Sequence, residues 1–203
     1  MSQKTKGIYK IFSNTYFYLF VQKIMSATSF RGKVIKKIIN KKNVKVLDIG
    51  CGPAEILEYL PKIKYFGYDI NNDYISYAKK RFGDKGQFYC KKFTVNELKK
   101  IPKFDYVILF GLLHHLEEIE IKKLLINIKK ALKKNGKLIT LDNVFTENQN
   151  LIAKFLIKMD RGQNVRTKKE YIRILYKSFK KIKSQIIHQT FIPYTWFVTI
   201  CNK

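Results

Sequence analysis

The sequence has few acidic residues, few cysteines and no long apolar run. Its 15 Asp and Glu residues face 41 Lys and Arg residues, which leaves a formal net charge of +26. The early apolar run at 16–21 is too short to cross a membrane, and it does not have the layout of a signal peptide. We therefore expect a cytoplasmic protein.

The cysteines exclude two further classes of protein. Cys51, Cys90 and Cys201 are odd in number and include no CxxC pair. Neither a disulfide framework nor a cysteine-based zinc site fits that pattern. We expect buried, reduced thiols and no bound metal.

The excess of positive charge favours anionic partners, which include nucleic acid, an acidic membrane face and phosphorylated substrates. Nearly all the cations are Lys, and the chain is also rich in Ile and Asn. An AT-rich genome produces that bias without selection for binding. Both interpretations stay open at this stage.

The apolar pattern predicts one α/β domain. Apolar residues make up 46% of the chain, enough for a full core at this length. From residue 43 onward, short apolar runs alternate with helical stretches, which is typical of a parallel sheet wound on both faces. The predicted strands are 44–49, 64–70, 86–90, 104–110 and 137–142. The predicted helices between them are 54–60, 72–82, a short one after a capping box at 94–97, and one whose stripe runs from 121 to 132.

The two ends of the chain differ from this middle part. An apolar stripe at 8–24 predicts helical structure, and a second helix is expected at about 27–39. Near the other end we expect a helix at 151–159 and another that opens with the capping box Thr167 to Glu170. The inward face of the latter should comprise Tyr171, Ile172, Leu175, Tyr176 and Phe179. Two β-rich runs, 181–189 and 194–201, are joined too tightly for a parallel crossover, so they pair antiparallel or lie apart.

One turn indicates a nucleotide cofactor. The first strand ends in Asp48-Ile49-Gly50-Cys51-Gly52-Pro53-Ala54, and glycines at a strand-to-helix turn let the backbone approach a ligand. Asp69 ends the second strand, where a carboxylate can accept hydrogen bonds from ribose hydroxyls. This combination fits any adenosine cofactor in a doubly wound fold.

Longer stretches make the resemblance more specific. "VLDIGCGPAEILEYL" resembles motif I of the class I S-adenosylmethionine-dependent methyltransferases, and "YFGYDIN" resembles their second motif. "FDYVILFGLLHHL" and "ALKKNGKLITLD" are similar to the fourth strand and to the helix and fifth strand that follow, so the match covers about 43–142. The late segments also resemble a bacterial branch that acts on small molecules. The glycine pattern departs from the GxGxxG of dehydrogenases.

The resemblance implies a Rossmann-like, seven-stranded sheet in the order 3-2-1-4-5-7-6, with the last strand antiparallel. It also implies a single methyltransferase domain over 1–203. Its parts would be an N-terminal helical cap and lid (1–42), a cofactor-binding core (43–142), a helical lid segment (143–180) and closing strands (181–203).

The resemblance also implies the cofactor, S-adenosyl-L-methionine, and its product, S-adenosyl-L-homocysteine. Asp48 would lie near the methionine ammonium, Asp69 would bind the ribose, and Ile70 would pack on the adenine. The remaining expected contacts are Gly50, Cys51 and Gly52 in the turn and Gly111 and Leu112 after the fourth strand. Two departures from the family pattern are Ala54 in place of a third glycine and Cys90-Lys91-Lys92 in place of an acid that contacts adenine.

Three residues are candidates for the chemistry. Methyl transfer is an in-line displacement that mainly requires alignment, with a base if the nucleophile is a hydroxyl. His114 and His115 follow the fourth strand and Asp142 ends the fifth, at the sheet edge where ligands bind. Either histidine could deprotonate or orient an acceptor, or cap the following helix. His188 is expected to be structural.

The segment 160–166, "DRGQNVR", is a candidate for acceptor binding. It carries two of the five arginines in the chain. Arg161, Gln163 and Arg166 offer fork-like donors that suit carboxylate or phosphate. The alternative is an ordinary loop whose arginines pair with Asp160 or cap the flanking helices.

The expected function is methyl transfer to a small or lipid- or sugar-linked, anionic metabolite. One alternative is a nucleic-acid methyltransferase, although the chain has no NPPY-type motif and no Pro-Cys pair after the fourth strand. The other alternative is a binding protein that retains the fold and lies on an anionic membrane at the inner face.

Overall fold

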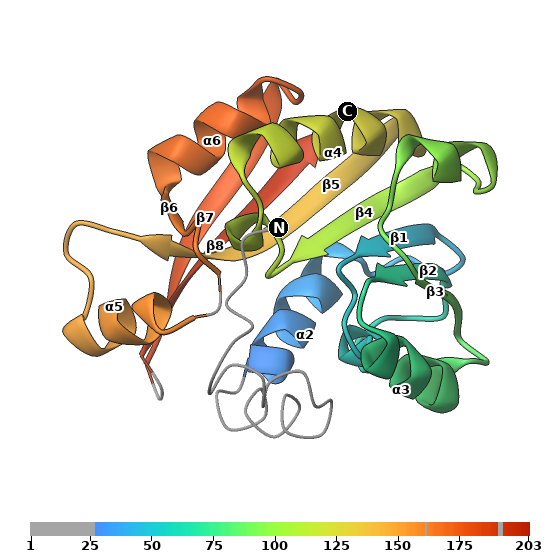
Figure 1. Cartoon of the computed structure of the whole chain (residues 1–203), viewed down its shortest axis with the longest axis horizontal. Helices are drawn as coiled ribbons and strands as arrows, with labels where there is room; N and C mark the ends of the chain where they lie inside the picture. Colours follow the sequence, from blue (N-terminus) through green and yellow to red (C-terminus); the bar gives the residue numbers. More distant parts are fainter. Residues whose placement is uncertain (1–26, 161, 191–192) are drawn as a thin grey trace. The chain divides into compact units, whose positions relative to one another are not determined.

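The computed structural model describes residues 27–160, 162–190 and 193–203. The apolar stripe predicted at 8–24 lies outside these residues. The described chain forms two compact units, one ending at Phe93 and one beginning at Thr94. Each unit is described by itself below, and Figure 1 labels their helices and strands.

The first unit is a three-stranded parallel sheet with two α-helices. Its strands β1 (Lys45–Ile49), β2 (Lys64–Asp69) and β3 (Gly86–Cys90) lie in the order β3-β2-β1. Helix α3 (Asn72–Phe82) packs on β2 and β3, and α2 (Ala27–Ile38) packs on the short 3-10 helix η2 (Glu55–Glu58). The Asn71 side chain caps α3 by accepting hydrogen bonds from the backbone of Asp73 and Tyr74.

The helix predicted at 54–60 is the main correction in this unit. Only one 3-10 turn forms, and no side chain caps its first residues. Ala54 precedes it in the left-handed conformation, with φ of 59°. Pro61 follows closely and disfavours helical backbone at Leu60. The segment is therefore bounded at both ends by backbone that an α-helix cannot use.

The second unit is a mixed sheet with helices. Its main strands are β4 (Phe104–Phe110), β5 (Leu132–Phe145), β7 (Lys181–Gln189) and β8 (Tyr194–Asn202), in the order β4-β5-β8-β7. Strands β4 and β5 are parallel, whereas β8 is antiparallel to both β5 and β7. The two units therefore contain the two halves of the predicted strand order.

The helices of this unit connect those strands. The α-helices are α4 (Glu118–Ala131), α5 (Leu151–Lys158) and α6 (Lys168–Tyr176), and the 3-10 helices are η3 (Val95–Lys99) and η4 (Leu113–His115). Helices α4 and α6 pack beside each other, and α5 packs on β5 and β8 (Figure 1). The predicted capping box of α6 is confirmed, because Thr167 and Glu170 exchange both of its hydrogen bonds.

Four details of this unit differ from the sequence-based expectation. Thr94 makes no side-chain cap, and the helix after it is 3-10. Helix α4 ends at Ala131, because β5 already begins at residue 132. The first part of β5 contains a bulge, and regular pairing with β4 resumes where Lys137 lies opposite Tyr106. On α6 Tyr171 and Leu175 are buried as predicted, but the third buried residue is Ile174, whereas Tyr176 is exposed. A two-residue strand that the sequence did not indicate, β6 (Arg166–Thr167), pairs with the end of β5.

The three cysteines are free thiols, as predicted, but only Cys201 is buried. Cys90 is exposed because it ends β3, the outermost strand of its unit. Among the described residues, no helix has both the length and the apolar character needed to cross a membrane.

Candidate functional site

The turn after β1 is built to bring backbone close to a ligand. Gly50 and Gly52 have φ of 75° and 54°, a conformation that side chains rarely adopt. The backbone N–H groups of Gly50 and Cys51 both donate to the Tyr68 carbonyl, which fixes the turn on β2. A Cβ on Gly52 would have no atom within 4 Å, so the space beside this backbone is open.

Ala54 stands where the family pattern has a third glycine, and its φ of 59° is the conformation a glycine would adopt without strain. Left-handed backbone costs an L-residue about 1–2 kcal/mol. Ala54 therefore adopts the left-handed backbone conformation that suits the family's third glycine, although the residue type differs.

Asp69 ties this turn to the start of α3. One of its carboxylate oxygens accepts from Gly52 N–H and the other from Asn71 N–H, each at 2.9 Å. The carboxylate is half-buried. Because two carboxylate oxygens offer about four acceptor positions, Asp69 can still accept from neighbouring hydroxyls of a ligand.

Asp48 is the buried acid of the same unit. Its Oδ2 accepts a 2.6 Å hydrogen bond from the Tyr65 hydroxyl, whereas its Oδ1 has no hydrogen-bond partner among the described residues. Burial, reinforced by Asp69, raises the pKa of Asp48 to about 7 although the Tyr65 hydrogen bond lowers it. An orphan acceptor of this kind fits a positively charged ligand group.

The other expected cofactor contacts are placed as follows. Ile70, which follows β2, is 55% exposed, an unusual exposure for an apolar side chain beside a buried strand. Burial raises the pKa of the Cys51 thiol well above its usual range, so this thiol is not a nucleophile. In the second unit, Gly111 directly follows β4 with φ of 66° and donates to Leu141 O, and Leu112 is buried.

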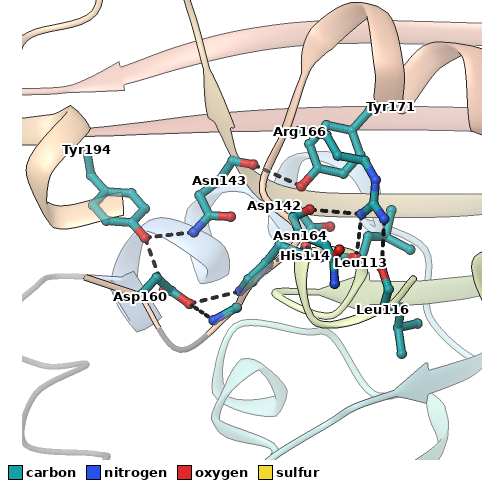
Figure 2. A network of polar contacts seen from close by, with 11 residues as sticks. Leu113, His114, Leu116, Asp142, Asn143, Asp160, Asn164, Arg166, Tyr171 and Tyr194 are labelled. Carbon is teal, nitrogen blue, oxygen red and sulfur yellow. Dashed lines mark hydrogen bonds and ion pairs between the residues drawn. The ribbon is translucent and has the colours of Figure 1, made fainter. Parts of the chain in front are cut away.

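His114 and Asp142 join the ends of two neighbouring strands. Asp142 lies in β5, and its Oδ1 is 2.7 Å from His114 Nδ1 in the turn after β4. The same oxygen accepts from the His114 backbone N–H at 3.2 Å. Both side chains are buried, and Figure 2 shows them at the centre of a polar network.

Asp160 reaches the other side of the same imidazole. Its Oδ1 lies 3.2 Å from His114 Nε2 and accepts from Gly162 N–H at 2.9 Å. Its Oδ2 accepts from the Tyr194 hydroxyl, which in turn accepts from the Asn143 amide (Figure 2). Burial disfavours the protonated ring, but Asp160 and Asp142 outweigh it and raise the pKa of His114 to about 9.

Arg166, the described arginine of the 160–166 segment, binds backbone carbonyls. Arg166 donates to the carbonyls of Leu113, Leu116 and Asn164, so its guanidinium holds the turn that carries His114 (Figure 2). Gln163 is exposed, and Arg161 lies outside the described residues. The geometry of Arg166 favours the loop-stabilising alternative over the expected contact with an acceptor.

The sequence indicated His114, His115 and Asp142, and it placed Asn143 beside Asp142 at the end of the fifth strand, but it missed the parts that Asp160 and Tyr194 play. His188, expected to be structural, is exposed on β7, where its ring lies 3.5 Å from the Thr195 hydroxyl. Asp160 was considered only as a partner for the arginines beside it. The signal that could have found it is Gly162, because a Cβ there would overlap the His114 ring and lie 2.8 Å from His114 O.

Comparisons with known proteins concern the fold of the chain. A family model described as a methyltransferase domain matches residues 47–138. No curated protein matches. A methyltransferase dependent on S-adenosylmethionine from Archaeoglobus fulgidus is similar in structure, with 19% identity and a TM-score of 0.73 over 93% of this chain and 100% of that one.

Two larger solved structures are also similar. Human N-acetylserotonin methyltransferase, solved with S-adenosylmethionine, is 18% identical with a TM-score of 0.68, over 98% of this chain and 60% of that one. The pyocyanin biosynthetic protein PhzM is 15% identical with a TM-score of 0.72, over 93% and 58%. The chain thus spans about three fifths of these two proteins. Together the matches confirm the predicted Rossmann-like fold and the resemblance to class I methyltransferases.

Proposed function

We propose that this chain, with its methyltransferase domain at 47–138 and its class I methyltransferase fold, transfers a methyl group from S-adenosylmethionine to a small-molecule acceptor. The observation that carries the proposal is the open glycine turn after β1, clamped by Asp69. Backbone access at Gly52 and a carboxylate at the next strand end together suit an adenosine cofactor, and the methyltransferase match over 47–138 supports S-adenosylmethionine among these.

The residues present fit the cofactor. Asp69 would accept from the ribose hydroxyls, and Ile70 would cover the adenine. The buried Oδ1 of Asp48 would face positive charge on the methionine side. The turn residues Gly50, Cys51 and Gly52, with Gly111 and Leu112 after β4, complete the proposed set. The bound cofactor would supply an activated methyl group, and the chain's own groups align the acceptor.

His115, His114 and Asp142 are the proposed catalytic residues. Asp142 fixes the orientation of the His114 ring by holding Nδ1, so Nε2 is left to orient an acceptor, and it can receive the acceptor's proton only once the ring has lost its own, above the raised pKa of about 9. Asp160 occupies that side of the ring in this structure. Gln163 and Arg161 remain proposed contacts for an anionic acceptor.

A nucleic-acid acceptor is less well supported. Five of the described lysines line one groove, namely Lys103, Lys129, Lys130, Lys177 and Lys203. Lys103 directly precedes β4, whereas His114 follows the other end of that strand. Seven strand residues span about 20 Å. A backbone bound in this groove would therefore lie at the wrong edge of the sheet for chemistry at His114.

A lipid-linked acceptor, or contact with an anionic membrane, is supported by α5. Leu151, Phe155 and Met159 recur every four residues on this helix, and all three are exposed, as is Ile152. Lys154 and Lys158, also exposed, flank them. An apolar stripe beside lysines is the pattern of a helix that lies in a membrane interface.

The acceptor class can be tested with S-adenosylmethionine carrying a labelled methyl group. Protein is incubated with a fractionated extract of its source organism, and label is counted in metabolites, lipids, nucleic acid and protein. The proposal expects label in metabolites or lipids with wild type and much less with Asp69→Ala. Label confined to nucleic acid or protein would overturn the acceptor class.

A further inference from the structure

Two adjacent histidines and an acid converge in the second unit, although the acid is far from the histidines in the sequence. His114 and His115 lie in η4, and Asp160 lies after α5. One donor atom from each of the three lies within 4.8 Å of the other two. The two imidazole rings are 4.1 Å apart between centroids. All three residues belong to the same compact unit.

The ring of His114 is oriented in the way that metal-binding histidines usually are. Its Nδ1 is engaged by Asp142 at 2.7 Å, which directs Nε2 toward Asp160. A carboxylate behind one ring nitrogen fixes the tautomer and makes the other nitrogen a better ligand. Figure 2 shows Asp142 and Asp160 on opposite sides of this ring.

Asp160 is held just as firmly. Gly162 N–H and the Tyr194 hydroxyl donate to its two oxygens. The loop comes this close only because residue 162 is glycine, since a Cβ there would overlap the His114 ring. Ligating carboxylates are commonly hydrogen-bonded in this manner.

The spacing suits a metal ion. His114 Nε2 and Asp160 Oδ1 are 3.2 Å apart. Two ligand atoms with metal bonds of about 2.0–2.2 Å at a tetrahedral angle lie roughly 3.4 Å apart. An ion could therefore bind after only a small increase in the distance between His114 Nε2 and Asp160 Oδ1. The local charge agrees, because Asp142 and Asp160 place two carboxylates around one imidazole.

We propose that His114 Nε2, one ring nitrogen of His115 and the carboxylate of Asp160 bind a divalent transition-metal ion of the Zn²⁺ or Mn²⁺ kind. The two imidazoles suit Zn²⁺ and the carboxylate suits Mn²⁺, whereas Mg²⁺ and Ca²⁺ prefer oxygen ligands throughout. Three protein ligands leave a coordination position open for an acceptor oxygen, whose pKa the ion would lower. The binding itself does not depend on the proposed methyl transfer.

The test uses full-length protein freed of metal with a chelator. Calorimetric titration with ZnCl₂ and MnCl₂, and elemental analysis after dialysis, should give about one ion per chain. We expect Asp160→Asn and His115→Ala to weaken binding at least tenfold, and the exposed histidine variant His188→Asn to leave it unchanged. Absence of stoichiometric metal, or equal affinity in Asp160→Asn, would overturn the proposal.

Wild-type protein loaded with Co²⁺ gives an answer that does not require the variants to fold. Nitrogen and oxygen ligation predicts visible bands of four- or five-coordinate Co²⁺ without a thiolate charge-transfer band. A thiolate band would assign the ion to a cysteine and contradict the site. S-adenosylhomocysteine binding is measured on the same samples, so failure of the cation site and failure of the proposed function are separate results.

Discussion

Asp142 Oδ1 lies 2.7 Å from His114 Nδ1, and this buried contact joins β5 to the turn after β4. The same carboxylate oxygen also holds the backbone N–H of His114, so the main chain and the ring are fixed together. The ring therefore keeps one tautomer and one orientation, with Nε2 as the reactive nitrogen. The other oxygen of Asp142 has no hydrogen-bond partner within the described part of the chain.

Replacing this carboxylate should uncouple chemistry from cofactor binding. In Asp142→Asn the amide cannot hold the imidazole as a carboxylate does, so we expect label transfer to fall at least about tenfold. Affinity for S-adenosylhomocysteine should stay near the wild-type value. The matched control is Asp105→Asn, since Asp105 lies at the far end of β4, where its carboxylate pairs with Lys133. Equal transfer rates in the two variants would refute the role of Asp142.

Arg166→Lys should destabilise the fold. Lysine cannot reproduce the fork that reaches the carbonyls of Leu113 and Leu116. We expect a loss of about 1–3 kcal/mol in the free energy of unfolding, measured by urea denaturation. Arg173→Lys is the control, because Arg173 makes an exposed ion pair with Glu118 and its replacement should lower the free energy of unfolding much less. Similar losses in both variants would contradict the structural role of Arg166.

Membrane contact predicts an effect of one side chain on α5. Phe155→Asp should lower binding to vesicles that contain phosphatidylglycerol by about tenfold, because it replaces an apolar ring with a negative charge. Ile126→Asp introduces the same charge at an exposed apolar position on α4 and should have a smaller effect. Cosedimentation at two salt concentrations measures both. No binding by wild type, or equal losses, would count against a role for α5.

The buried acid of the first unit predicts a pH dependence of stability. Burial raises the pKa of Asp48 to about 7, so between about pH 4 and 7 the folded chain keeps a proton that the unfolded chain has released. Folding then loses stability as the pH rises. The free energy of unfolding of wild type relative to Asp48→Asn should be highest below about pH 4, fall through this window by up to a few kcal/mol, and level off above it. A constant difference across the window would show that Asp48 is ionised throughout.

Elements defined by local patterns were predicted well from the sequence. Helix α3 has the predicted bounds, and the capping box of α6 forms as Thr167 and Glu170 indicated. The five strands predicted between residues 44 and 142 are present in the structure. They could be predicted because a short apolar run between turn residues is compatible with few structures other than a buried strand. The segment after Ala54 was misjudged, because an apolar stripe alone does not reveal that the backbone on either side excludes an α-helix.

The candidate site was only half visible in the sequence. The adjacent histidines after a buried strand indicated the edge of the sheet at which that strand ends. Asp160 is 46 positions from His114, and no local pattern reports that a loop returns to a given side chain. The sequence-based hypothesis assigned acceptor binding to the arginines of the same loop. In the structure Arg166 donates to backbone carbonyls, and Asp160 contacts the His114 imidazole.

Calorimetric titration with S-adenosylhomocysteine measures whether the turn after β1 and Asp69 hold an adenosine cofactor. Wild type should bind, and Asp69→Ala should bind at least about tenfold more weakly, because a charged hydrogen-bond acceptor is lost. Asp73→Ala, which removes an exposed carboxylate four residues away in the first turn of α3, should match wild type. No binding by wild type, or the same affinity in all three proteins, would contradict the account.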